Sequence, residues 1–213
     1  MRRRIPIVIM IAAVLAVPAA AQLGSRPAEE WIKTLDGPVR VAGLKIPEVV
    51  AAIKLQPGQI VADIGAGSGL FEVPLAQAVG PEGKVYAVEV DKAFFPEIRK
   101  RVSAGGVSNV ETVLGTFTDP ALPAKAVDVV FFHDVVHHIE DRRTYLEAVT
   151  RYLAPSGRIV IVDYEGGKGP HREQPELEVT REQLTDWMKG LGFAVVEDMK
   201  LFPDKYYLVF GRK

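Results

Sequence analysis

The chain has 213 residues, of which 26 are basic and 27 acidic, and 48% are hydrophobic. This length and composition suit one globular domain with a sizeable core, and the formal net charge of −1 provides no electrostatic footprint for nucleic acid. The chain contains no cysteine, which excludes disulfides, zinc–thiolate sites and cysteine nucleophiles.

The first residues have the order of a secretory signal peptide. Arg2, Arg3 and Arg4 precede the uncharged apolar run Ile5–Val17, and the small residues Ala19–Ala21 follow it. We therefore expect cleavage after residue 21, export to the periplasm and no membrane span in the mature protein. The alternative is an uncleaved anchor in the inner membrane, but the apolar run is shorter than the roughly 20 residues that span a bilayer comfortably.

Residues 22–46 precede the regular pattern and are predicted to form a linker and an N-terminal arm. Pro47 suits the first turn of a helix, which we expect over Glu48–Leu55. Beyond it, short runs rich in Val, Ile and Phe alternate with stretches of helical spacing, which is typical of buried parallel strands connected by helices. The strands are expected at Ile60–Ile64, Lys84–Val88, Val110–Leu114, Val127–Phe132 and Arg158–Val162.

The C-terminal part of the chain departs from this alternation. Thr180 and Gln183 have the spacing of a helix capping box. No helix fits between the strand-like runs Phe193–Val196 and Tyr206–Phe210, which should pair as an antiparallel hairpin. We therefore expect residues 47–213 to form a Rossmann-like α/β domain: a doubly wound, mostly parallel seven-stranded sheet with a C-terminal antiparallel hairpin. A long loop, residues 164–176, should lie at the ligand-binding end of this sheet.

A glycine-rich segment joins the first expected strand to the next helix. It reads Asp-Ile-Gly-Ala-Gly-Ser-Gly from Asp63 to Gly69, and alternate glycines there let the backbone turn sharply and approach a ligand closely. A dinucleotide fingerprint would require glycine at the position of Leu70, and the Lys-Ser/Thr pair of a phosphate-binding P-loop is absent. A strand-to-helix turn without a ligand is the alternative.

Acidic residues follow the second expected strand. Glu89 comes directly after the apolar run and can accept hydrogen bonds from two ribose hydroxyls. Asp91 is expected to cap the following helix. A surface salt bridge is the alternative role for either carboxylate.

These segments resemble the class I S-adenosylmethionine-dependent methyltransferases over residues 47–213. Asp63–Gly69 is similar to the first motif of that family, and Glu89 to its ribose-binding acid. His133–His138 resembles the segment after the fourth strand in the ubiquinone-biosynthesis-like branch, and Leu153–Arg158 resembles the turn before the fifth strand. The resemblance implies S-adenosylmethionine as the cofactor and an unidentified small molecule as the methyl acceptor.

The resemblance also implies roles for individual residues. Asp63 would bind the methionine amino group, and the turn at His133 and Asp134 would close the methionine side. Many members hold the adenine amino group with an aspartate where this chain has Thr116, so the backbone of Thr116, Asp119 or stacking by Phe117 would have to serve. The cysteines used by arsenic methyltransferases are absent. The residues expected around the cofactor are Asp63, Gly65, Ala66, Gly67, Gly69, Glu89, Val90, Gly115, Thr116, Phe117, His133 and Asp134.

The four histidines are the remaining candidates for chemistry. His137, His138 and His171 follow the fourth and fifth expected strands, so we expect them to face the acceptor pocket as pocket-lining or acid–base groups that hold no metal. His133 and His137 have a metal-ligand spacing only if they share a helix, whereas His133 ends a strand. The alternative function is a non-catalytic exported protein that binds a ligand or a metal on the same fold.

Overall fold

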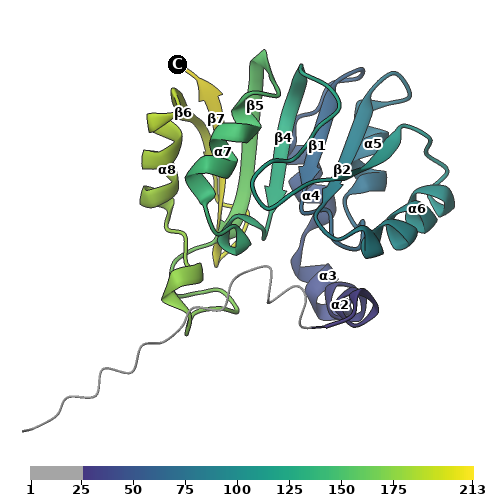
Figure 1. The fold of residues 1–213 in the computed structure, drawn as a ribbon, viewed down its shortest axis with the longest axis horizontal. Coiled ribbons are helices and arrows are strands. Elements are labelled where there is room, and N and C mark those ends of the chain that lie inside the picture. The colour runs from purple at the N-terminus through teal and green to yellow at the C-terminus, as the bar shows by residue number, and fades with distance from the viewer. Residues whose placement is uncertain (1–25) are drawn as a thin grey trace, which may run out of the picture.

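A computed structural model describes residues 26–213, so the predicted signal peptide lies outside the described residues. Its centre is a seven-stranded sheet in the order β3-β2-β1-β4-β5-β7-β6 (Figure 1). Strands β1 to β5 pair in parallel, and β7 runs antiparallel to both β5 and β6. This arrangement confirms the predicted fold class. The strands are β1 (Ile60–Ile64), β2 (Lys84–Glu89), β3 (Val110–Leu114), β4 (Val127–His133), β5 (Leu153–Tyr164), β6 (Phe193–Met199) and β7 (Lys205–Arg212).

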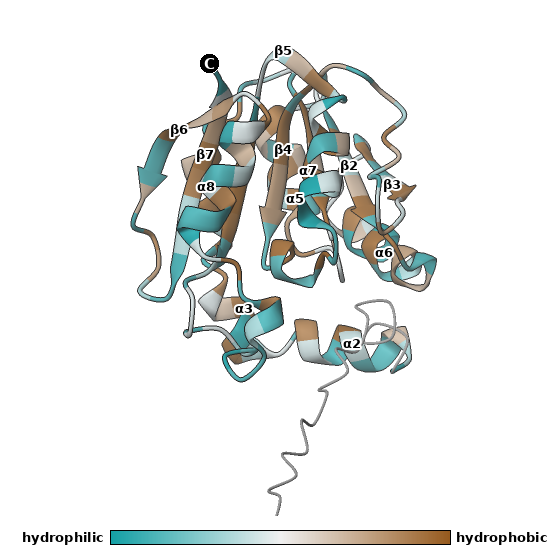
Figure 2. Ribbon diagram, turned by 60° about the vertical axis from the view of Figure 1, so that its left-hand side comes forward, coloured by the Kyte–Doolittle hydropathy of each residue, from teal (hydrophilic) through white to brown (hydrophobic). Residues whose placement is uncertain are grey.

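Helices cover both faces of the sheet because neighbouring strand residues point to opposite sides. Ala62 and Ile64 belong to the core beneath α7 (Arg142–Thr150) and α8 (Arg181–Gly190). Val61 belongs to the core beneath α4 (Ile46–Ile53) and α5 (Glu72–Val79), and α6 (Phe95–Ala104) packs beside α5. Figure 2 shows the hydrophobic strands between helices whose outward sides are hydrophilic.

Two short helices lie across the carboxyl edge of the parallel strands. They are α2 (Ala28–Leu35) and α3 (Pro38–Gly43), and both lie below the ends of β1 and β4 in Figure 1. Within residues 26–213, no helix is both long and apolar enough to cross a membrane. The arm therefore contributes to the one edge of the sheet at which α/β proteins bind their ligands.

Most expected elements are present, with shifted ends. The helix expected over Glu48–Leu55 spans Ile46–Ile53 instead, and it ends at Lys54, whose φ of 57° is left-handed. Strand β5 begins at Leu153 rather than Arg158, since Leu153 pairs with Val127 before a bulge interrupts the register. The capping box of α8 is confirmed: Thr180 Oγ1 accepts a hydrogen bond from the Gln183 amide, and Gln183 Oε1 accepts one from the Thr180 amide.

Candidate functional site

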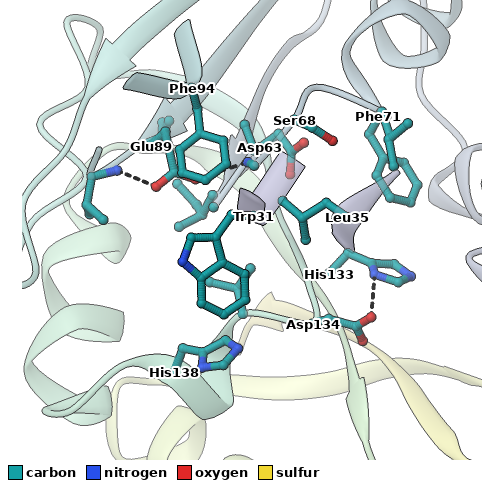
Figure 3. A pocket seen from close by; sticks show the side chains of 18 of the residues that line it. Trp31, Leu35, Asp63, Ser68, Phe71, Glu89, Phe94, His133, Asp134 and His138 are labelled. Atoms are coloured by element: carbon teal, nitrogen blue, oxygen red, sulfur yellow. Dashed lines mark hydrogen bonds and ion pairs between the residues drawn. The ribbon is translucent and has the colours of Figure 1, made fainter. Parts of the chain in front are cut away.

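A pocket opens between β1 and β4, where the strand order of the parallel sheet reverses (Figure 3). Doubly wound sheets bind ligands at this point because the loops from neighbouring strands diverge there. The pocket is lined by residues that follow β1, β2 and β4, by the arm and by the loop after β5. Its walls are mostly apolar, and its polar groups include Asp63, Ser68, Glu89, Asp134 and His138.

The glycine loop forms one wall of this pocket. Gly65 and Ala66 each donate their amide to the carbonyl of Val88, which ties the loop to the end of β2. Gly65 has a φ of 74°, and a Cβ there would lie 2.5 Å from Val135 Cγ2. Gly67 has a φ of 55°, which side-chain-bearing residues rarely adopt. The backbone is therefore exposed to the pocket in a conformation that depends on glycine.

Glu89 ends β2 and links the loop to its own strand. Its Oε2 accepts a hydrogen bond from the Gly67 amide at 3.0 Å, and its Oε1 accepts one from the Val90 amide at 2.7 Å. Burial raises the pKa of Glu89 above its ordinary value, and these backbone amides oppose the rise. A carboxylate oxygen can accept more than one hydrogen bond, so Glu89 retains capacity for a ligand in the pocket. Asp91 instead accepts from the Ala93 amide and caps the next turn, as predicted.

Asp63, at the fourth position of β1, faces a second buried acid. Glu72 is fully buried in the first turn of α5, and neither of its carboxylate oxygens has a hydrogen-bond partner among the described residues. Burial raises the pKa of Asp63 well above its ordinary range, and the nearby Glu72 adds to the rise. Burial also raises the pKa of Glu72 to about 7. A cation in the pocket beside Asp63 would favour the ionised form of this pair.

His133 and Asp134 close the pocket at the end of β4. Burial alone would raise the pKa of Asp134, but the His133 ring and the Lys205 ammonium outweigh it and hold the pKa below its ordinary value. Lys205 Nζ lies 2.7 Å from Asp134 Oδ2. Asp134 Oδ1 has no hydrogen-bond partner among residues 26–213, and Asp134 lines the pocket. It is an available acceptor for a donor group of a ligand.

The segment after β3 lies at the rim. Thr116 and Phe117 both line the pocket, and Phe117 is 48% exposed. Thr116 Oγ1 accepts hydrogen bonds from the amides of Thr118 and Asp119, so its side chain holds the turn. Asp119 Oδ1 accepts from the Tyr152 hydroxyl at 2.7 Å, and Asp119 does not line the pocket. Sequence analysis offered three possible adenine contacts, the Thr116 backbone, Asp119 and Phe117. Of these, Thr116 and Phe117 lie at the pocket, and Asp119 does not.

The N-terminal arm packs against the glycine loop on the pocket side. Trp31 and Leu35 of α2 line the pocket, and a Cβ on Gly67 would lie 3.1 Å from Leu35 Cδ1. Asp36, the residue after α2, accepts a hydrogen bond from Ser68 Oγ at 2.7 Å and forms an ion pair with Arg101 of α6. Asp36 therefore fastens the arm to both the loop and the domain.

Replacing Asp36 with alanine is expected to release α2 from the loop, at a cost of about 1–2 kcal/mol after allowance for partial exposure of the ion pair. Trp31 fluorescence should then shift toward longer wavelengths in a Trp187→Phe background, which leaves Trp31 as the only tryptophan. Glu29→Ala, on an exposed position of the same helix, is the matched control. An unchanged Trp31 spectrum in Asp36→Ala would contradict the fastening role.

The expected site residues are mostly brought together. Gly69 and Gly115 do not line the pocket: Gly69 packs against Ile98 of α6, and Gly115 against Val88. His138 and His171 line it, whereas His137 lies in a smaller adjoining pocket. Sequence reasoning did not single out the arm residues Trp31, Leu35, Arg40 and Leu44, nor Ser68, Phe71, Glu72, Phe94, Val135 and Tyr145.

Comparison with known proteins shows which families the sequence resembles. Residues 62–161 match the sequence model described as a methyltransferase domain. The chain is 28% identical over 178 residues to an arsenite methyltransferase of Halobacterium salinarum, a match that covers 84% of this chain and 44% of that protein. Residues 62–161, which are 100 of the 213 residues, are thus similar to a methyltransferase domain.

Solved structures show the same fold. A SAM-dependent methyltransferase from Aquifex aeolicus matches with a TM-score of 0.76 at 26% identity, covering 87% of this chain and 97% of that one. A 1,6-didemethyltoxoflavin-N1-methyltransferase from Burkholderia thailandensis, solved with S-adenosylhomocysteine, matches with a TM-score of 0.72 at 22% identity, covering 95% and 93%. This chain spans less than half the length of the arsenite methyltransferase.

Proposed function

We propose that this methyltransferase domain binds S-adenosylmethionine and transfers its methyl group to a small-molecule acceptor. The observation that carries the proposal is the Glu89 carboxylate, which lines the pocket and accepts the Gly67 amide. A carboxylate fixed against a glycine loop at the end of the second strand can hold the ribose hydroxyls while the loop accommodates the rest of the cofactor.

The remaining polar groups suit the charged end of the cofactor. Asp63 offers its carboxylate to the methionine ammonium group, as does Asp134 Oδ1, which has no hydrogen-bond partner within the described residues 26–213. Phe117 lies at the opposite rim, where an aromatic face can stack on adenine. The ligand would thus lie across the carboxyl ends of β2, β1 and β4.

Methyl transfer from a sulfonium requires little acid–base machinery. The acceptor's lone pair forms the bond to the methyl carbon as the carbon–sulfur bond breaks, and S-adenosylhomocysteine leaves as a neutral thioether. Positioning donor and acceptor can contribute an effective molarity of roughly 10⁵–10⁸ M. His138 and His171 lie where they could take a proton from an acceptor hydroxyl or acidic carbon.

The acceptor is proposed to be a small organic molecule, and the domain a member of the ubiquinone-biosynthesis-like branch. The segment His133–His138 supports that branch, and Trp31, Phe71 and Tyr145 give the pocket an aromatic lining. Trivalent arsenic favours thiolate ligands, and this chain has no cysteine to supply one. An arsenic acceptor is therefore disfavoured.

Calorimetric titration with S-adenosylmethionine and S-adenosylhomocysteine tests the cofactor assignment. We expect both to bind with a stoichiometry of one. Absence of binding at millimolar ligand to a chain shown to be folded would contradict the proposal and favour a non-catalytic protein on the same fold.

Replacing Gly67 with valine is expected to weaken S-adenosylmethionine binding by at least about tenfold. The side chain must adopt a left-handed φ, which costs on the order of 1–2 kcal/mol, and its Cβ must displace Leu35. Calorimetric titration of the variant measures the loss. Gly190→Val, where a Cβ would meet no atom within 4 Å, is the control at a glycine outside the pocket. Equal affinity of Gly67→Val and wild type would show that the loop does not contact the cofactor.

We also propose that the protein is exported and that its mature form begins at Gln22. The order of basic, apolar and small residues in positions 2–21 supports this. N-terminal sequencing of protein expressed from the full gene should give Gln22 as the first residue. A retained Met1 together with membrane association would instead support an anchor.

A further inference from the structure

Three histidine rings meet beside the acceptor side of the pocket. His137 and His138 lie in the turn after β4, and His171 lies in the loop after β5. The ring centroids of His137 and His138 are 4.1 Å apart, and that of His171 lies 5.4 Å and 5.1 Å from them. One ring nitrogen of each residue lies within 4.8 Å of those of the other two.

Hydrogen bonds orient two of these rings. His137 Nδ1 lies 2.6 Å from Asp163 Oδ1, and His171 Nδ1 lies 2.9 Å from Gln174 Oε1. Both partner oxygens can accept a hydrogen bond from Nδ1, and in the tautomer that makes this bond the lone pair lies on Nε2. A carboxylate or amide oxygen behind the distal nitrogen is the usual support of a metal-binding histidine.

The packing of the three rings suits one shared ligand. Each ring offers one nitrogen within 4.8 Å of those of the other two, so a single cation between them can bind all three.

Asp163 supplies negative charge to the cluster. It is buried behind His137 and accepts hydrogen bonds from the amides of His137 and Tyr164 as well as from the His137 ring. Arg142 lies nearby and interacts electrostatically with Asp163, although its Nη2 donates to the carbonyls of His137 and Glu176. A buried carboxylate that lies against a histidine ring is suited to balance a dication beyond that ring.

We propose that His137, His138 and His171 form a three-histidine site for a divalent first-row transition metal ion of the zinc type. Zinc–nitrogen bonds of about 2.0–2.1 Å place ligand atoms roughly 3.3 Å apart in a tetrahedral site. On binding, the ring nitrogens would have to approach from their present spacing, which is within 4.8 Å, to this value. The sequence predicted that these three residues face the acceptor pocket and hold no metal. The present proposal departs from that prediction because the structure brings one ring nitrogen of each residue within 4.8 Å of the others.

The site would communicate with the main pocket. His138 and His171 line that pocket, and three protein ligands leave a tetrahedral ion one open position for water or a substrate atom. A methyl acceptor in the main pocket could coordinate this ion through the lone pair of an oxygen or nitrogen atom. This role in the reaction rests on the proposed function, whereas metal binding itself does not.

Metal binding can be measured with Co²⁺ and Zn²⁺ alone, on untagged full chain stripped with a chelator. We expect one Co²⁺ per chain with the visible absorption of a four- or five-coordinate ion, displaced by Zn²⁺. His171→Ala should weaken binding by at least about 100-fold, as loss of one of three ligands requires. Arg172→Ala, at the exposed neighbouring position, should bind like wild type.

Asp163→Asn tests the support behind His137. Loss of such an outer partner typically weakens metal affinity by about 10–100-fold. Circular dichroism shows whether this buried variant folds, and Gln174→Ala, at an exposed position behind His171, gives the same test if it does not. No stoichiometric Co²⁺ or Zn²⁺ in wild type, or equal binding by wild type and His171→Ala, would overturn the site. Either result leaves the binding of S-adenosylmethionine, measured without metal, to be judged separately.

Discussion

Replacing Glu89 with alanine is expected to weaken S-adenosylmethionine binding by at least about 100-fold. One carboxylate would accept hydrogen bonds from two ribose hydroxyls, and each such bond to a charged group contributes about 1.5–3 kcal/mol. Loss of both corresponds to a factor of about 100 or more, at about 1.4 kcal/mol per tenfold. The burial of Glu89 favours the upper part of this range, because hydrogen bonds are stronger away from solvent.

The substitution also acts on the glycine loop. In the protein without ligand, Glu89 already accepts the amides of Gly67 and Val90. Alanine leaves both amides without this acceptor, so the loop loses the contact that holds Gly67 against β2. The variant therefore loses affinity through the ribose contacts and through loop order together.

Two further variants separate these contributions. Glu89→Gln keeps a side-chain oxygen for one amide and should retain more affinity than Glu89→Ala. Asp91→Ala removes the neighbouring acid, which caps the turn after β2, and should bind like wild type. Calorimetric titration of folded variants gives the affinities. If Asp91→Ala lost affinity and Glu89→Ala did not, the ribose contact would belong to Asp91.

The centre of the sheet was predictable from the sequence because strands β1, β2 and β4 are buried on both faces. Runs such as Val127–Phe132 are continuous and apolar, and the observed strand β4 differs from that prediction by one residue. The start of β5 was missed, since Ala154, Pro155 and Ser156 interrupt the apolar pattern and its first pair with β4 is separated by a bulge. The local hydrophobic pattern thus predicted the parallel strands, but it did not predict the strand end at which the pairing is irregular.

The site was predictable where one local segment forms it, and less so where distant segments meet. The spacing of Asp63–Gly69 identified the loop without the structure. Trp31 and Leu35 have the spacing of one helix face, which signals packing but does not say against what. Glu72 reads as an ordinary acid in a first helical turn, where acids are favoured, and only the structure shows that it is buried beside Asp63.

This buried pair should make the stability of the protein fall as the pH rises from about 4.5 to about 7. Burial raises the pKa of Glu72 to about 7, although the Arg101 charge opposes part of the rise. In the unfolded chain the same carboxyl titrates near its ordinary value, so the folded state binds more protons throughout this interval. Stability then decreases with increasing pH, and the part of the loss due to Glu72 levels off above its raised pKa of about 7.

Glu72→Gln is expected to remove the part of this decrease that Glu72 contributes, while the part due to the buried Asp63 remains. Glutamine is neutral at all pH values and has nearly the shape of protonated glutamate, so variant and wild type should have similar free energies of unfolding at pH 4.5. At pH 8 the variant should be more stable, by on the order of 3 kcal/mol for a shift of this size. The removal of Glu72 also lowers the pKa of Asp63, because one cause of its rise is gone.

Urea denaturation at pH 4.5, 6 and 8 measures the effect, with Glu82→Gln at an exposed position as the control. That control should follow the wild-type curve at each pH, since it replaces an exposed carboxyl and leaves the buried pair intact. Parallel curves for wild type and Glu72→Gln would show instead that Glu72 ionises in the folded protein without penalty. Arg101, the cation that already lowers the pKa of Glu72, would then be the group that compensates its charge.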